Sequence, residues 1–193
     1  YLQEEIPTAI KQSIEGVERV SGIVMAMKEF SHPGSKRKEP ADINHIIENT
    51  VTVCKSEWKL HADMKLELDP TLKMVPCHIG EMNQVLLNLI INAAHAITEK
   101  GGPEKGQITI STRADGGWAE VRVADTGAGM SDKIKEKIFD PFFTTKDVGK
   151  GTGQGLSISR DVIVKKHGGK MEVTSRVGEG TEFVIRLPLE TEI

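Results

Sequence analysis

Apolar residues recur every three or four positions near the start of the chain, a spacing that predicts one long amphipathic helix at 6–30. Pro33 and Gly34 end this pattern. A lone helix of this length is unstable in water, so we expect its apolar stripe to pack on a partner helix or a second copy of the chain. Packing on the neighbouring domain is the alternative. The chain is thus expected to divide into a helical segment at 1–32 that contains this helix, a polar linker at 33–40 and a domain at 41–193.

The segment after residue 40 mixes helical and strand-like patterns. Asp42 is expected to cap a helix that ends near Lys55, and a largely apolar pattern predicts a buried helix from His78 to about Lys100. Further helices are expected at 131–138 and 156–168, and alternation predicts strands at 64–69, 107–113, 118–124, 170–176 and 181–189. Strands gathered around three helices indicate an α+β fold, a two-layer α/β sandwich whose mixed sheet is covered on one face by about three helices.

Composition and charge narrow the classes of partner. The 193 residues include 25 basic and 28 acidic side chains, a formal charge of −3, so there is no basic surplus for a nucleic-acid partner. No apolar run approaches the roughly 20 residues that span a bilayer, and we expect no direct membrane contact by this chain, although a parent protein could be membrane-anchored. Cys54 and Cys77 lack disulfide or metal-ligand spacing, which favours a cytoplasmic setting.

Two asparagines stand inside the most apolar predicted helix. Asn88 and Asn92 are four residues apart, so they share one helix face. Amide oxygens are hard ligands suited to Mg²⁺, an ion that prefers to share substrate phosphates. Amides that bond only neighbouring backbone are the open alternative. His95, one turn beyond Asn92, could face the same place.

The segment DTGAGM at 125–130 places an acid and two glycines directly after a predicted strand. Glycine takes positive φ readily and lets another molecule approach the backbone, so Gly127 and Gly129 suggest a tight turn beside a ligand. Asp125 would then face that ligand. An ordinary turn is the alternative, since acids and glycines also punctuate hairpins.

A third segment, KGTGQGLS at 150–157, brings three glycines to the start of a predicted helix. Free N–H groups and the positive end of the helix dipole make such a loop suitable for an anion. Its spacing does not match the Walker pattern, and a flexible surface loop is the alternative. Just upstream, Thr144 and Lys146 add a hydroxyl and a cation.

In this order, the segments resemble the motifs of the Bergerat ATP-binding fold. That fold is shared by sensor histidine kinases, DNA gyrase, heat-shock chaperones of the ninety-kilodalton class and mismatch-repair ATPases. NLIINAAHA resembles the histidine-kinase N box, DTGAG the G1 box, FDPFFTTK the F box and GTGQGL the G2 box. The resemblance covers about residues 40–189 and implies a domain of the GHKL superfamily that binds ATP and Mg²⁺.

The same resemblance implies roles for single residues. Asp125 would accept a hydrogen bond from the adenine amine with Thr181 supporting that edge, and Asn92 would ligate Mg²⁺ with Asn88 beside it. His95 stands where many kinases have Lys, and Gln154 stands where Leu is commoner. The implied ATP-binding residues are Asn88, Asn92, His95, Asp125, Gly127, Gly129, Met130, Ile138, Phe139, Thr144, Lys146, Lys150, Gly151, Thr152, Gly153, Gln154, Gly155, Leu156 and Thr181.

The resemblance also favours a kinase over a hydrolase. Hydrolytic members carry a Glu that activates water at the position of Asn88, and an amide cannot act as a general base. We therefore expect transfer of the γ-phosphoryl of ATP to a protein side chain, aided by positioning and charge neutralisation, with slow hydrolysis as background.

The phosphoacceptor is expected to lie outside this chain. None of the six histidines resembles the phosphorylated histidine of the H box. The helix at 6–30 resembles the second arm of the dimerisation hairpin, so the acceptor helix would be absent. The chain should therefore bind ATP without phosphorylating itself, and it would contain no catalytic acceptor residue.

The implied partners are ATP, the acceptor-helix domain of the parent protein, a response regulator and, for the full-length protein, a second copy in a homodimer. Two alternatives stay open. A GHKL serine/threonine kinase of the anti-sigma-factor type conflicts with the long N-terminal stripe. A regulatory module would bind nucleotide without transferring a phosphoryl group.

Overall fold

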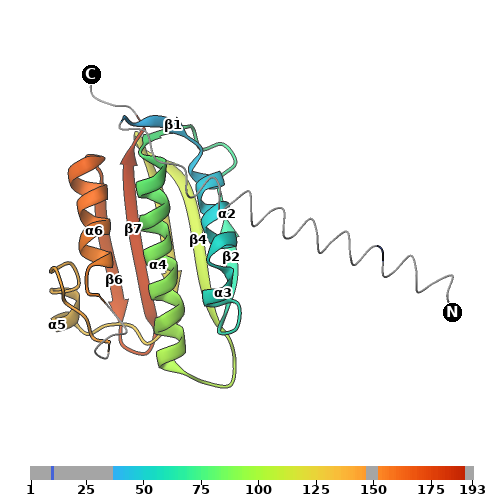
Figure 1. Ribbon diagram of the computed structural model, residues 1–193, viewed down its shortest axis with the longest axis vertical. Helices are drawn as coiled ribbons and strands as arrows, with labels where there is room; N and C mark the ends of the chain where they lie inside the picture. Colours follow the sequence, from blue (N-terminus) through green and yellow to red (C-terminus); the bar gives the residue numbers. More distant parts are fainter. Residues whose placement is uncertain (1–9, 11–36, 147–151, 190–193) are drawn as a thin grey trace.

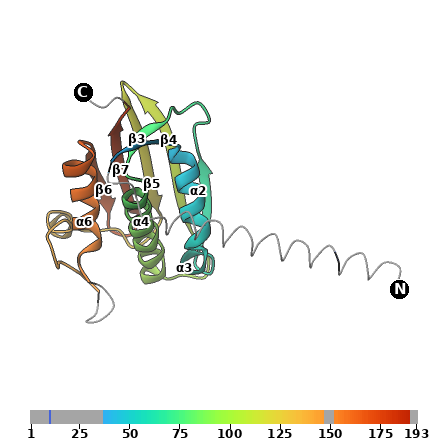
Figure 2. The same cartoon turned by 45° about the horizontal axis from the view of Figure 1, so that its top comes forward.

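The computed structural model describes residue 10, residues 37–146 and residues 152–189. The helix predicted at 6–30 lies outside the described residues except for Ile10, and Lys150 and Gly151 also lie outside them. Figure 1 and Figure 2 show two layers, a twisted sheet and a row of helices on one of its faces.

The sheet layer has five strands in the order β2-β4-β5-β7-β6. β2 pairs parallel with β4, and every other neighbouring pair is antiparallel. The mixed sheet predicted from the alternating segments is therefore confirmed. The strands are β2 (Ala62–Glu67), β4 (Gly106–Asp115), β5 (Trp118–Asp125), β6 (Lys170–Arg176) and β7 (Gly180–Pro188).

The helices α2, α4 and α6 lie side by side over the sheet, with α4 in the middle (Figures 1 and 2). Asp42 caps α2 as predicted, because its Oδ1 accepts hydrogen bonds from the backbone N–H groups of Asn44 (2.9 Å) and His45 (3.2 Å). The helices are α2 (Ile43–Val53), α3 (Lys55–Trp58), α4 (Ile79–Lys100), α5 (Asp132–Lys135) and α6 (Gly155–Asp161).

The core forms where α4 meets the inner face of the sheet. Leu86, Leu89 and Ile90 of α4 are buried, as are Ile108 of β4 and Ile185 of β7. Alternation along the strands sends these side chains to the helix side, which is why the period of two in the sequence identified the sheet. The α+β sandwich predicted from the sequence is confirmed. Among the described helices, none has the length and apolarity that a bilayer crossing requires.

A small second sheet was not predicted. β1 (Glu39–Ala41) pairs antiparallel with β3 (Val75–Cys77). Glu39 and Pro40 therefore belong to a strand, whereas the sequence pattern assigned them to the linker. A strand of three residues offers too short an alternation to be recognised.

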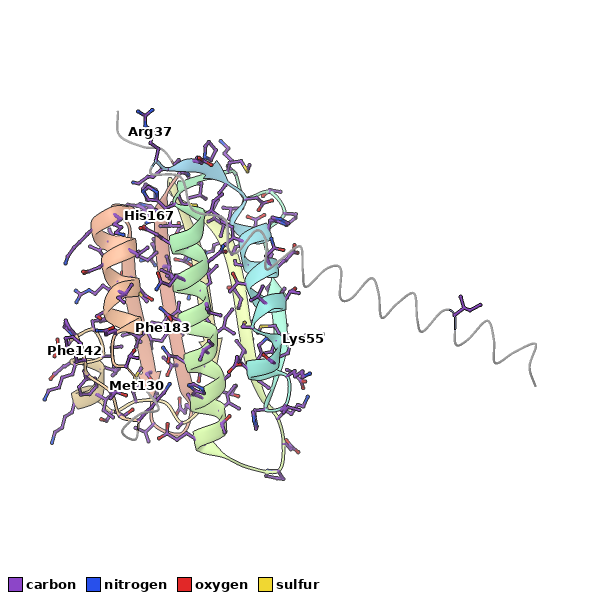
Figure 3. All side chains as sticks on the ribbon, viewed as in Figure 1. Arg37, Lys55, Met130, Phe142, His167 and Phe183 are labelled. Atoms are coloured by element: carbon purple, nitrogen blue, oxygen red, sulfur yellow. The ribbon has the colours of Figure 1, made fainter. Side chains whose placement is uncertain are left out.

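The predicted helix at 156–168 is also divided in two. α6 ends at Asp161 and continues as a five-residue π-helix, Val162–Lys166. His167 follows it and is buried, and its side chain joins this segment to the start of α4. Its Nδ1 donates to the Val162 carbonyl (2.8 Å), and its Nε2 accepts from the backbone N–H of His78 (2.9 Å). Figure 3 labels His167 at this end of the helix layer. Burial lowers its pKa.

The other face of the sheet carries a cluster of charged side chains. Glu120 of β5 has no exposed surface, although it points away from the helices. Its Oε1 accepts hydrogen bonds from Arg113 and Arg122, both at 2.7 Å, and its Oε2 accepts one from Arg186 at 2.9 Å. Burial would raise the pKa of Glu120, but the three guanidinium groups outweigh it and lower the pKa to about 2. Glu120 and the three arginines thus form an ionic cluster on this face.

Candidate nucleotide site

A cavity of about 370 Å³ opens between α4, α6 and the loop that follows β5. Met130 and Phe183, both labelled in Figure 3, lie at this cavity between α4 and α6. The cavity brings together residues from the N box, the G1 box, the F box and the G2 box. The predicted site residues that line it are Asn88, Asn92, His95, Asp125, Gly129, Met130, Ile138, Thr144, Lys146, Thr152, Gly153, Gly155, Leu156 and Thr181.

Of the predicted residues that the structure describes, Gly127, Phe139 and Gln154 do not line the cavity. Phe139 instead lies under the guanidinium of Arg160, whose Cζ is 5.0 Å from the ring centroid. Ile138, which precedes Phe139 and was also predicted to bind ATP, is buried and lines the cavity.

Sequence reasoning missed several lining residues. Phe183 points to the same side of β7 as Thr181, so the alternation of that strand could have identified it. Ile134 lies in the short helix α5, four residues before Ile138. Phe143 also lines the cavity, whereas its neighbour Phe142 is 71% exposed and has a positive φ of 68°. No periodicity distinguishes two adjacent phenylalanines.

Asp125 is the last residue of β5 and pairs with Thr181 of β7. Its Oδ1 accepts a hydrogen bond from the backbone N–H of Gly127 at 2.8 Å. Burial raises the pKa of Asp125 to about 6, because the carboxylate loses hydration. A ligand that donates a hydrogen bond to this carboxylate would stabilise its ionised form.

The Thr181 side chain is held by a hydroxyl network that the sequence did not reveal. Thr181 Oγ1 lies 2.9 Å from Ser175 Oγ, and Ser175 donates to the Gly180 carbonyl at 2.9 Å. The same Ser175 oxygen accepts a hydrogen bond from the backbone N–H of Met130 at 2.8 Å. Ser175 therefore links the turn between β6 and β7 to the segment after Asp125.

The two glycines of the G1 segment face the protein's own backbone. A Cβ on Gly127 would lie 2.5 Å from the backbone carbon of Ala96 in α4. A Cβ on Gly129, whose φ is +66°, would overlap the carbonyl oxygen of Arg176. The tight turn predicted here is present, but close packing of the segment on α4 and β6 is what requires glycine.

A cluster of polar groups on α4 forms another part of the cavity wall. Lys146 Nζ lies 3.3 Å from Asn92 Oδ1 and 2.6 Å from His95 Nδ1. An ammonium group can only donate, so both atoms accept from it. Burial lowers the pKa of Lys146, and burial together with the Lys146 charge lowers the pKa of His95.

Asn88 joins α4 to α6 at the same cavity. Its Nδ2 donates to the Gly155 carbonyl at 3.2 Å and to Ser159 Oγ at 3.3 Å. Ser159 is fully buried and donates to the same carbonyl at 2.8 Å. The Asn88 nitrogen is thus bonded within the protein, to one backbone group and one side chain of α6. Its oxygen takes no part in these bonds.

The mixed sheet is covered on one face, and a cavity there joins the half-buried Asp125 carboxylate to amide and cationic side chains. This arrangement defines an ATP-binding domain of the Bergerat type. Residues 78–191 match the family model described as "Histidine kinase-, DNA gyrase B-, and HSP90-like ATPase". The chain belongs to this family.

Similar proteins identify the histidine-kinase branch. The sensor kinase CckA of Brucella abortus (strain 2308) is 35% identical over 189 residues, which cover 90% of this chain and 19% of CckA. The chain thus spans about a fifth of the length of that relative. The solved catalytic domain of histidine kinase ThkA is 33% identical, with a TM-score of 0.68 over 79% of this chain and 95% of the ThkA domain.

A second ThkA structure, in complex with response regulator protein TrrA, aligns with 96% of this chain and 52% of ThkA, at 28% identity and a TM-score of 0.65. These similarities confirm the predicted resemblance to the ATP-binding catalytic domain of sensor histidine kinases.

Proposed function

We propose that this chain binds ATP together with Mg²⁺ and supplies the catalytic domain of a sensor histidine kinase. In the parent protein, the γ-phosphoryl of ATP would pass to a histidine on a separate helix. The observation that carries this proposal is a single cavity that is lined both by the half-buried Asp125 carboxylate and by the cluster of Lys146, Asn92 and His95.

The adenine contacts follow from the Asp125 side of the cavity. Asp125 Oδ1 already accepts the Gly127 N–H, and its carboxylate retains acceptor capacity for an exocyclic amine. Thr181 stands beside it on β7, held by Ser175. Apolar side chains from Met130, Ile138 and other lining residues suit the flat, weakly polar faces of a purine.

The polar cluster on α4 fits a magnesium ion and phosphates. Asn92 directs its amide oxygen at a cation, the Lys146 ammonium, so that oxygen is oriented for a positive partner. Asn88 uses only its nitrogen in its bonds to α6 and keeps its oxygen available. Asn92, with Asn88 beside it, would hold Mg²⁺, and Lys146, His95 and the Thr144 hydroxyl would contact the phosphates. When bound, Mg²⁺ neutralises charge on the transferred phosphoryl group.

The residue at position 88 favours transfer over hydrolysis. Asn88 is an amide that bonds to Gly155 and Ser159, and it can neither take a proton from water nor deliver one. The role of this chain is then to hold ATP in place for an acceptor that another segment supplies.

The similar proteins support the wider assembly. CckA is a sensor kinase, and ThkA has been solved with a response regulator. We extend both properties to the parent of this chain as proposals. It would work in the cytoplasm, form a homodimer through its helical hairpin and pass its phosphoryl group to a response regulator.

Binding and transfer can be tested separately. Asp125→Asn should weaken ATP binding measured by calorimetry, whereas Asp63→Asn, a matched change at an exposed acid of β2, should leave it unchanged. Unchanged affinity in Asp125→Asn would refute the adenine contact.

For transfer, a separate acceptor-helix dimer is incubated with this chain, labelled ATP and Mg²⁺. Label on histidine, which is acid-labile and base-stable, supports the kinase proposal. Label on serine would instead indicate the serine/threonine kinase alternative, and ATP binding without label would indicate a regulatory module.

A further inference from the structure

Asn92 and His95 form a seat for one cation on α4, which we name the α4 seat. The two residues are three positions apart, so they lie on one face of the helix, and both accept a hydrogen bond from the same Lys146 ammonium. Lys146 comes from the F-box segment, 54 residues away in sequence from Asn92. A side chain from a distant loop therefore supplies a positive charge to the proposed metal ligand.

A magnesium ion and the Lys146 ammonium would repel each other if both were bound to the Asn92 oxygen. Mg²⁺ binds an oxygen ligand at about 2.0–2.1 Å, which is closer than the 3.3 Å between Lys146 Nζ and Asn92 Oδ1. Two cations on one partly exposed oxygen would be near neighbours, and solvent would screen only part of their repulsion. One of them must leave the seat when the other arrives.

We propose that Lys146 is a resident cation of the α4 seat, which Mg²⁺ displaces when it enters with ATP. This inference rests on the proposed ATP-binding function. The lysine stem has four rotatable carbons, so the ammonium can move from Asn92 to a phosphate oxygen without a change in the fold. Lys146 thus serves two acceptors in turn, first the seat and then the nucleotide.

The exchange has a consequence for metal dependence. When ATP binds without metal, Lys146 supplies the positive charge at the phosphates. When ATP binds with Mg²⁺, the metal supplies that charge, and displacement of Lys146 from Asn92 opposes part of the gain. The unmodified chain should therefore distinguish poorly between ATP and Mg²⁺-ATP, and a chain without Lys146 should depend strongly on the metal.

His95 offers a readout that needs no nucleotide. Because its Nδ1 accepts from Lys146, the neutral ring must carry its proton on Nε2. Nitrogen NMR of the histidine rings distinguishes the two tautomers. We expect the Nε2–H tautomer for His95 in the unmodified chain and a mixture of tautomers in Lys146→Met. A predominant Nδ1–H tautomer in the unmodified chain would overturn the proposal.

The binding experiment compares three proteins by calorimetry, each with ATP plus a chelator and with ATP plus Mg²⁺. They are the unmodified chain, Lys146→Met, and the control Lys65→Met, in which an exposed lysine of β2 is changed in the same way. A charge-assisted hydrogen bond accounts for about a tenfold or larger change in affinity. Lys146→Met should lose at least that factor for metal-free ATP and less than about threefold for Mg²⁺-ATP. The Lys65→Met control should match the unmodified chain.

Two results would overturn the exchange. Equal losses for both forms of the nucleotide would make Lys146 a simple phosphate contact, and no loss for either would remove it from the site. If the unmodified chain bound neither form, the proposed function itself would fail, while the NMR measurement would still report the contact between Lys146 and His95. A second variant, His95→Leu, removes one acceptor and keeps the lysine. Because Lys146 then leaves the seat more easily, the ratio of the affinity for Mg²⁺-ATP to that for metal-free ATP should rise by about fivefold.

Discussion

The substitution Asp125→Asn should lower the affinity for ATP and raise the free energy of unfolding. The amide keeps an oxygen that can accept the Gly127 N–H, so the local geometry is preserved. Burial raises the pKa of Asp125 from 3.8 to about 6, and the folded domain therefore binds a proton on this group more tightly than the unfolded chain. The contribution of Asp125 to stability is fully present below pH 3.8 and is lost as the pH rises through about 6.

The pKa shift sets the size of the effect. One pKa unit corresponds to about 1.4 kcal/mol, so burial of the ionised carboxylate costs at most about 3 kcal/mol at pH 7. Solvent at the open cavity screens part of this, which leaves about 1–2 kcal/mol. Asp125→Asn should raise the free energy of unfolding by that amount at pH 7. It should also reduce ATP affinity by about 30-fold or more, since it removes a hydrogen bond to a charged acceptor.

Urea unfolding and calorimetric ATP binding at pH 7 test the two effects. The two tryptophans, Trp58 and Trp118, offer a fluorescence signal for unfolding. Repeating the unfolding at pH 4.5 should remove most of the stability gain, because the unmodified Asp125 is then protonated. A loss of stability at pH 7 would refute the desolvation argument, and an unchanged affinity would refute the adenine contact. Asp63→Asn is the control for a change of charge alone.

Three further changes test other parts of the structure. Glu120→Gln should lower the free energy of unfolding in urea by about 1–2 kcal/mol at pH 7. Since the pKa of Glu120 is lowered from 4.5 to about 2, this difference should shrink as the pH falls below 4.5, and a constant difference would contradict the ionic account. Gly129→Ala should lower the melting temperature and ATP affinity together, because a Cβ meets the Arg176 carbonyl at a positive φ, with a loss of about 2 kcal/mol or more. His167 has a lowered pKa, so its contribution to stability is present above pH 6.5 and lost at lower pH, and His167→Gln should flatten the decline in urea midpoint between pH 7 and pH 5.

The features that the sequence predicts well are those with a local physical signal. Alternation marked the five long strands, and the Asp42 cap follows from one side chain and the two N–H groups next to it. Motif order placed most of the cavity-lining residues, because each motif sits at the end of an element whose position the sheet determines.

Features that depend on distant contacts could not be predicted. Gly127 is required by its contact with Ala96, and Gly129 by its contact with Arg176. Each of these partners is remote in sequence from the glycine that it contacts. The contact of Lys146 with α4 spans more than fifty residues, and no pattern near either residue indicates it. The π-helix before His167 arises where the chain must meet the start of α4, a condition that appears only in three dimensions.

The ionic cluster around Glu120 has a consequence for how such domains behave when two are tethered close together. An exposed apolar sheet face favours association with another sheet. The three guanidinium groups around the Glu120 carboxylate keep that part of the sheet face hydrated and disfavour such association. In the homodimer proposed above, two such domains would not associate through this part of the sheet, and each would stay free to reach an acceptor helix.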